Sequence, residues 1–192
     1  MALPWLLMIA GVAVAADYRS KRKTVQTDRY LRPSRDRSLA LRPSEFLPGK
    51  RFVSPQPGSV VVCHVYGVVE HSGIWLGDDT IAELHGSGLI RGISAKRFLT
   101  GRTGATIFTC CDHLHRPFAT ASAVDRAAQQ LFTHRDYHLR RNNCHRFVWY
   151  CLTGEELMIR SFDNLNRMLA DFYGAALYWD PVEVDEDLSL AQ

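Results

Sequence analysis

Short apolar runs separated by glycine-containing turns occupy the chain between residues 59 and 110, and this spacing is typical of β-strands. After residue 120 the apolar positions recur at helical spacing instead. The expected strands lie near residues 59–66, 68–76, 80–85, 89–93 and 105–110, with a short helix at 95–99 among them. The expected longer helices span about 122–132, 144–152 and 161–173. Strands followed by helices predict an α+β fold.

Capping residues mark the starts of the longer helices. Ser122 and Asp125 form a capping box, and Ser161 opens the last helix. Asn142 and Asn143 are favourable N-caps for the middle helix, which is expected at about 144–152. Cys144 consequently falls in the first turn of its helix, where free backbone N–H groups and the helix dipole favour a thiolate over a thiol.

The turn Gly77-Asp78-Asp79 predicts how two strands pair. If it closes a hairpin with Leu76 opposite Thr80, His71 lies opposite His85 and diagonal to Glu83. These three side chains share one face because side chains alternate along a strand. The other face carries apolar residues expected in the core, namely Ile74, Leu76, Ala82 and Leu84. Diagonal neighbours lie about 7–8 Å apart at the backbone, so this spacing allows either Glu83 or His85 to orient His71.

Cys144 and His71 together supply a thiol nucleophile and an imidazole base, the minimum pair for thiol acyl-transfer chemistry. His71 lies within an expected strand, which is a rigid position for a base. A cysteine at a helix start is more often a small buried apolar residue, and Cys144 shares a helical stripe with Phe147, Val148 and Cys151. The same stripe directs the sulfur toward the sheet that carries His71, which favours the catalytic interpretation.

Three segments carry a family resemblance, which runs from about residue 57 to about 157 and covers roughly half of the chain. Pro57-Gly-Ser-Val-Val-Val is similar to the first strand of the lecithin:retinol acyltransferase family. His71-Ser-Gly-Ile-Trp-Leu-Gly-Asp resembles its histidine block, and Asn143-Cys-His-Arg-Phe-Val its Asn-Cys-Glu-His-Phe-Val block. The resemblance implies a circularly permuted papain-like fold related to the NlpC-type peptidases, with an antiparallel sheet packed against the helix that carries the nucleophilic Cys144.

The chain departs from the family pattern at two places. His145 and Arg146 stand where the family usually has Glu and His, and Glu83 stands where many members carry a second histidine. The resemblance favours Glu83 over His85 as the residue that orients His71. A carboxylate suits this role because it holds one ring nitrogen protonated and stabilises the imidazolium. The implied catalytic triad is Cys144, His71 and Glu83, and the implied substrates are phospholipids or other acyl lipids.

An uninterrupted apolar run from Ala2 to Ala16 indicates a membrane-directed segment, with Trp5 placed like an interfacial anchor. As a helix it is about 22 Å long against a hydrocarbon core of about 30 Å, so it spans only with Asp17 and Tyr18 drawn in or with a thinned bilayer. The alternative is a cleaved signal peptide, but no Lys or Arg precedes the run. We expect an uncleaved anchor and a cytoplasmic domain, because positive charge directly follows the run.

Composition and charge complete this organisation. A chain of 192 residues that is 46% hydrophobic suits one domain with a substantial core. The net charge of +3 combines a basic N-terminal quarter with an acidic C-terminal end. The expected parts are a membrane anchor at 1–18, a basic Pro-containing linker at 19–52, a catalytic domain at 53–179 and an acidic tail at 180–192. We expect the linker to contact anionic lipid and no specific nucleic acid.

Five cysteines, an odd number, suit a reducing compartment and agree with a cytoplasmic domain. The segment Cys110-Cys-Asp-His-Leu-His115 contains residue types that bind zinc. However, adjacent cysteines point to opposite faces of a strand, and no C-x-x-C or H-x-x-x-H pair accompanies them. We expect a strand end followed by a polar loop there, and neither a metal nor a cofactor in the protein.

The expected function is that of a thiol-dependent acyltransferase or acyl hydrolase that forms a thioester on Cys144. Backbone N–H groups at the start of the helix would stabilise the oxyanion. The acyl group would then pass to water, an amine or an alcohol. Two other classes stay open at this point: a cysteine peptidase or amidase of the NlpC-related type, favoured by an exported domain, and a non-catalytic membrane-tethered binding module.

Overall fold

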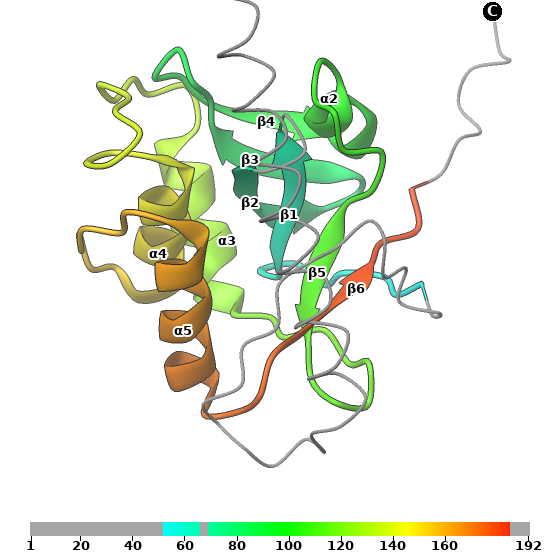
Figure 1. Ribbon diagram of the computed structural model, residues 1–192. Helices are drawn as coiled ribbons and strands as arrows, with labels where there is room; N and C mark the ends of the chain where they lie inside the picture. The colour runs from blue at the N-terminus through cyan, green and yellow to red at the C-terminus, as the bar shows by residue number, and fades with distance from the viewer. Residues whose placement is uncertain (1–51, 66–68, 185–192) are drawn as a thin grey trace, which may run out of the picture.

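The computed structural model of the chain describes residues 52–65 and 69–184, in which one six-stranded antiparallel sheet is joined by four helices (Figure 1). The strands lie in the order β4-β3-β2-β1-β5-β6 across the sheet. Their bounds are Val60–Val65 (β1), Val69–Gly77 (β2), Thr80–Leu84 (β3), Ile90–Ser94 (β4), Phe108–Cys111 (β5) and Tyr178–Pro181 (β6). The helices span Ala95–Leu99 (α2), Ala121–Gln130 (α3), Cys144–Thr153 (α4) and Phe162–Tyr173 (α5). The expected α+β class is confirmed.

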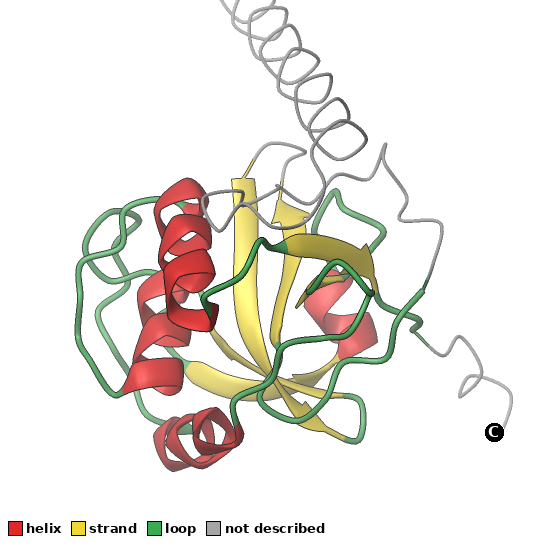
Figure 2. Cartoon of the chain, turned by 90° about the horizontal axis from the view of Figure 1, so that it is seen from below, coloured by secondary structure: helices red, strands yellow, loops and turns green. Residues whose placement is uncertain are grey.

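Helices cover the two faces of the sheet unequally. α3, α4 and α5 lie on one side of the sheet, and the short α2 lies on the other (Figures 1 and 2). The larger hydrophobic cluster joins the sheet to α4 and α5 through large buried side chains, among them Ile74, Phe108, Phe147 and Leu165. The smaller cluster includes Val61, Ile81 and Phe98 of α2. The sheet is therefore buried on both faces.

The β2–β3 hairpin decides which side chains meet at the candidate site. Ile74 pairs with Ala82 and Trp75 pairs with Ile81, as the sequence predicts. Thr80 pairs with Gly77 and not with Leu76, so that part of the prediction is wrong by one residue. The reason is a bulge that lets Asp78 and Asp79, with φ of 45° and 54°, form a tight two-residue turn. The bulge leaves the register on the His71 side unchanged.

The helix starts agree with the predicted caps in two cases out of three. Asn143 caps α4 and Ser161 caps α5, each by accepting a backbone N–H bond. The predicted capping box at Ser122 is wrong, because the N-cap of α3 is Thr120, two residues earlier, and its side chain makes no capping hydrogen bond. The backbone N–H of Thr120 donates to the Gly58 carbonyl at 3.2 Å, which ties the residue before α3 to the segment that leads into β1.

Strand β6 is the element that the sequence pattern does not predict. Its four residues are all buried, so they show no alternation of apolar and polar positions. β6 pairs with β5 at the edge of the sheet and extends two residues beyond the expected domain end at 179. Asp180, expected as the first residue of the acidic tail, is buried and lies 3.0 Å from the ring of His115.

The expected membrane anchor and nearly all of the basic linker fall in residues 1–51, outside the described part of the chain. The end of the acidic tail, residues 185–192, also lies outside it. Among the helices described between residues 52 and 184, none is both long enough and apolar enough to cross a membrane.

Candidate active site

Cys144 is the first residue of α4, and Asn143 holds this helix start in place. The side-chain oxygen of Asn143 accepts from the Arg146 N–H at 3.0 Å. Its side-chain nitrogen donates to the carbonyls of Leu139 at 2.7 Å and Ile159 at 2.8 Å. Asn143 thus caps the helix and joins it to the loops on both sides. The predicted position of Cys144 in the first helical turn is confirmed, and the residue is 3% exposed.

His71 and Glu83 meet across the β2–β3 hairpin. His71 Nε2 lies 2.7 Å from Glu83 Oε2, and both side chains are buried. Gly73 stands between them on the same face of β2. A Cβ atom at Gly73 would come within 2.7 Å of Ile81 Cγ2 and 2.8 Å of the Ala82 carbonyl. Only glycine therefore lets β2 lie this close to Ile81 and the Ala82 carbonyl of β3.

His85, the alternative partner for His71, lies beyond the end of β3 and is directed elsewhere. Its Nδ1 lies 2.9 Å from Ser87 Oγ and accepts the Ser87 backbone N–H at 3.2 Å. These contacts belong to the turn between β3 and β4. Of the two residues that strand geometry allowed, the structure brings Glu83 to His71.

Glu83 is the centre of a larger ion cluster than the sequence predicts. Its Oε1 accepts from Arg91, with Nη2 at 2.7 Å and Nε at 2.8 Å. Its Oε2, the oxygen next to His71, also accepts from Arg102 Nη2 at 2.6 Å. Burial alone would raise the pKa of Glu83, but the hydrogen bond and charge of His71, with the charge of Arg102, hold it far below its usual range. Glu83 is therefore a carboxylate at every physiological pH.

Cys144 and His71 shift each other's protonation. Burial alone would lower the pKa of His71, but the charge of Cys144 and hydrogen bonds to Cys144 and Glu83 raise it to about 9. Burial would raise the pKa of the Cys144 thiol, but electrostatic interactions with His145 and His71, and hydrogen bonds to both, bring it well below its usual value. A thiolate and an imidazolium are therefore the expected pair at neutral pH.

Three further side chains near the sulfur were not predicted as parts of the site. His145 Nδ1 lies 3.8 Å from Cys144 Sγ and 2.9 Å from Ser72 Oγ. Tyr137 forms a hydrogen bond with Cys144, and burial together with the charge of Cys144 raises the pKa of the phenol to about 12. Tyr137 therefore stays protonated and donates to the sulfur. His145 directly follows Cys144 in the sequence, and this adjacency could have indicated its place beside the sulfur. No pattern links Ser72 or Tyr137 to Cys144, so only the folded chain brings those two side chains to it.

Of the two arginines that pair with Glu83, only Arg91 could have been predicted as its partner from the sequence. Arg91 pairs directly with Glu83 in the β3–β4 ladder. The Gly86-Ser-Gly88 turn between the two expected strands could have suggested this cross-strand pair of opposite charges. Arg102 follows α2 in a loop, and nothing in its neighbourhood of the sequence indicates its contact with Glu83.

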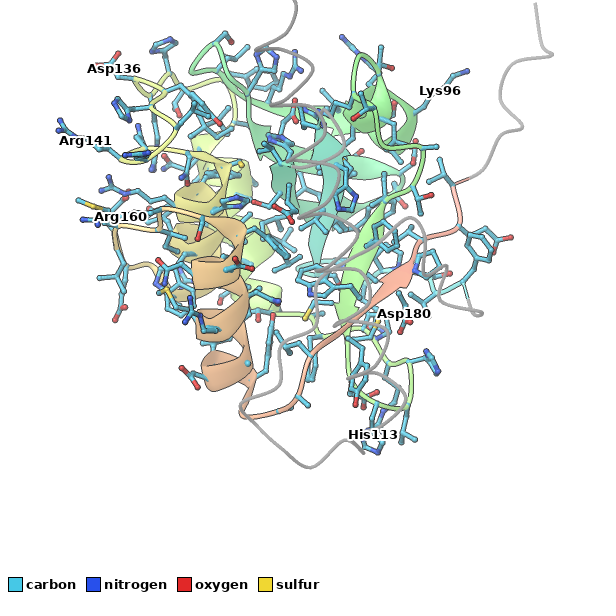
Figure 3. The ribbon with its side chains drawn as sticks, viewed as in Figure 1. Lys96, His113, Asp136, Arg141, Arg160 and Asp180 are labelled. Atoms are coloured by element: carbon cyan, nitrogen blue, oxygen red, sulfur yellow. The ribbon has the colours of Figure 1, made fainter. Side chains whose placement is uncertain are left out.

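A pocket of about 350 Å³ opens at Cys144. Its lining includes apolar side chains from three segments, Val69, Leu139 and Phe162, and two arginines, Arg140 and Arg160. Arg141 and Arg160 project from the helix side of the molecule near α4 (Figure 3). Cys144 and His145 both line the pocket, so a ligand within it can reach the sulfur.

The cysteine and histidine segment at 110–115 lies far from this pocket. Cys110 and Cys111 end strand β5 and a turn follows, as predicted. His113 and Asp180 lie on the opposite side of the molecule from α4 (Figure 3). No group of three or more potential metal ligands is found among residues 52–65 and 69–184.

Comparison with protein-family models gives no match for this chain, and comparison with curated proteins gives none either. The chemistry of the site must therefore be argued from its own residues. Those residues are a buried cysteine at a helix start, a buried imidazole whose electrostatics couple to its thiol, and a carboxylate in contact with the imidazole.

The thiol pKa shifts predict selective alkylation of Cys144. Burial raises the pKa of Cys63 and Cys151 to about 12, and it also raises those of Cys110 and Cys111. At pH 6 an ordinary thiol is less than about 1% ionised, so Cys144 should react with iodoacetamide far faster than the other four. Peptide mass spectrometry after brief labelling measures this, with Cys144→Ala as the control. Faster labelling of any other cysteine would contradict the assignment.

Proposed function

We propose that this chain is a thiol-dependent acyltransferase or acyl hydrolase in which Cys144, His71 and Glu83 form the catalytic triad. One observation carries the proposal, namely the buried 2.7 Å contact between His71 Nε2 and Glu83 Oε2. Because this contact occupies Nε2, the other ring nitrogen of His71 is available to Cys144. A buried carboxylate that orients an imidazole toward a nucleophile is the arrangement that acyl transfer requires.

The proposed reaction begins with the Cys144 thiolate, whose proton His71 holds. The sulfur attacks an ester, thioester or amide carbonyl, and the oxyanion is stabilised by the backbone N–H groups at the start of α4. His71 then donates its proton to the leaving group, and a thioester remains on Cys144. The acyl group passes from the thioester to water, an amine or an alcohol.

The fold that we propose is the circularly permuted papain-like fold implied by the lecithin:retinol acyltransferase resemblance. Support comes from the order of the site residues along the chain: His71 on β2, Glu83 on β3, and Cys144 at the start of α4. Further support comes from the packing of α4 against β2 and β3 of an antiparallel sheet.

Acyl lipids are the substrates that we propose. Support comes from the pocket at Cys144, where apolar side chains suit an acyl chain. Its two arginines, Arg140 and Arg160, outnumber its one carboxylate, Glu70, and suit an anionic group such as a lipid phosphate. The apolar run at 2–16 and the basic residues after it would hold such an enzyme at a membrane, with the catalytic domain on the cytoplasmic side.

Trapping the acyl-enzyme tests this function. The full-length protein is incubated with phosphatidylcholine vesicles, with an acyl thioester or with a small peptide amide, and its intact mass is measured. We expect a mass increase equal to one acyl group, mapped to Cys144 and removed by hydroxylamine, which cleaves thioesters. Cys151→Ala, a change in the same helix, should keep the adduct, and Cys144→Ala should lose it.

Each result of this experiment discriminates between functions. An adduct from the lipid supports the acyltransferase or acyl hydrolase. An adduct from the peptide amide alone would replace it with a peptidase or amidase. No adduct from any donor, with Cys144 intact, would favour a non-catalytic binding module.

A further inference from the structure

Cys144 interacts with a second imidazole besides that of His71. His145 follows Cys144 in the first turn of α4 and is 6% exposed. Its Nδ1 lies 3.8 Å from the sulfur and 2.9 Å from Ser72 Oγ. A histidine whose nearest polar neighbours are the reacting sulfur and a buried hydroxyl is placed for proton transfer at that sulfur.

The two imidazoles have different surroundings. The ring of His71 is bound to Glu83 and lies 5.3 Å from the ring of Phe98, on the face of the sheet where α2 packs. Ser72, the next residue, points to the opposite face, and there it meets His145 on α4. His145 lines the pocket together with Cys144, whereas His71 is not among the residues that line it. An acceptor that enters through the pocket therefore meets His145.

Ser72 suits a histidine that gains and loses a proton in place. A hydroxyl donates to Nδ1 when the imidazole is neutral, and it accepts from Nδ1–H when the imidazole is charged. The carboxylate of Glu83, in contrast, favours only the charged form of His71. Ser72 keeps the ring of His145 oriented in both states.

We propose that His145 is a second catalytic imidazole, which takes the proton of the acceptor in the second half-reaction. This inference rests on the proposed function. After the first half-reaction, the proton of His71 has left with the leaving group. The acceptor oxygen or nitrogen bonds to the thioester carbon while its proton passes to the lone pair of His145 Nδ1. The Ser72 hydroxyl, which donates to that lone pair in the neutral imidazole, rotates to accept from the new Nδ1–H. The carbon–sulfur bond then breaks, and its electron pair stays on the sulfur.

In this proposal the resting state returns by proton transfer through the sulfur, which lies 3.8 Å from His145 Nδ1 and interacts electrostatically with His71. The His145 imidazolium gives its proton to Cys144 Sγ, and the thiol gives it to His71. The proton that the acceptor lost thus replaces the one that His71 donated. No group outside the site is required.

The two half-reactions can be measured separately with a p-nitrophenyl ester of a fatty acid. Release of p-nitrophenolate in the first turnover reports acylation, and the later steady rate reports transfer to water or to an added amine. In His145→Gln of the full-length protein, we expect acylation within about 10-fold of wild type and transfer reduced by about 10² to 10³. The acyl-enzyme should accumulate toward one per chain in the intact mass. In His71→Gln the first-turnover release should be lost.

Control variants separate a catalytic effect from a structural one. His113→Gln changes an exposed histidine on the far side of the molecule and should behave as wild type. Ser72→Ala should slow transfer less than His145→Gln does, and Ser72→Thr should restore it, because the hydroxyl is kept. If His145→Gln does not fold, the two variants Ser72→Ala and Ser72→Thr provide the same test.

Equal reduction of both half-reactions in His145→Gln would overturn the inference, since His145 would then act only on the thiolate. Unchanged kinetics would overturn it as well. Wild-type protein that releases no p-nitrophenolate and carries no acyl group on Cys144 would overturn the proposed function itself. The two failures are thereby distinguishable.

Discussion

His71→Gln is expected to lower turnover by about 10⁴ to 10⁶ while the protein stays folded, because catalytic groups that act as a unit lose most of their effect when one is removed. The amide of Gln can still donate to Glu83 Oε2, so the buried carboxylate keeps a partner. In the proposed mechanism, the variant lacks both the base that forms the thiolate and the acid that protonates the leaving group. The Cys144 thiol pKa should rise accordingly.

Steady-state kinetics on the donor found by acyl trapping would measure this effect. The double variant His71→Gln/Cys144→Ala should be no slower than Cys144→Ala alone. Wild-type turnover should fall as the pH rises through about 9, where His71 loses the proton that the leaving group needs. The residual turnover of His71→Gln should not show this fall near pH 9. His85→Gln is the matched control on the neighbouring turn, and a loss as large as that of His71→Gln would contradict the triad.

Glu83→Gln should lower the free energy of unfolding by about 3 kcal/mol or more, because breaking a buried ion pair leaves the remaining charges uncompensated. Glu83 is fully buried, and the side chain of Arg102 is only 11% exposed. The side chain of Arg91 is 30% exposed, so water lowers the free-energy cost of leaving its charge without a carboxylate partner. Turnover should fall by about 10² to 10⁴ as well, since the neutral amide no longer favours the imidazolium.

Chemical denaturation measures the stability change, and a double-variant cycle tests its cause. Glu83→Gln/Arg91→Gln should be less destabilised than the sum of the single variants, because their charges are coupled. The pKa of Glu83 is lowered on folding, so its contribution is fully present above about pH 4.5 and lost as the pH falls below that value. The difference in the free energy of unfolding between wild type and Glu83→Gln should therefore become smaller at acidic pH. An additive cycle or a pH-independent difference would contradict the buried ion cluster.

The local parts of this fold follow from the sequence. Side chains that alternate between two faces along residues 68–76 and 80–85 predict the hairpin and the face that His71 and Glu83 share. Asn143 predicts that a helix begins at Cys144. These signals act between residues that are neighbours along the chain or across one tight turn. That range is short enough for backbone geometry and hydrogen bonding to determine the result without the rest of the molecule.

Tertiary structure decided what the hairpin and the helix start bring together. It ends β3 at Leu84, which turns His85 toward Ser87 and leaves Glu83 to His71. It also joins Ser72 to His145 across 73 positions of sequence and pairs β5 with β6 at the sheet edge. Contacts over such distances depend on how the helices pack on the sheet, because only packing brings these segments close. Periodicity and capping carry no information about that arrangement.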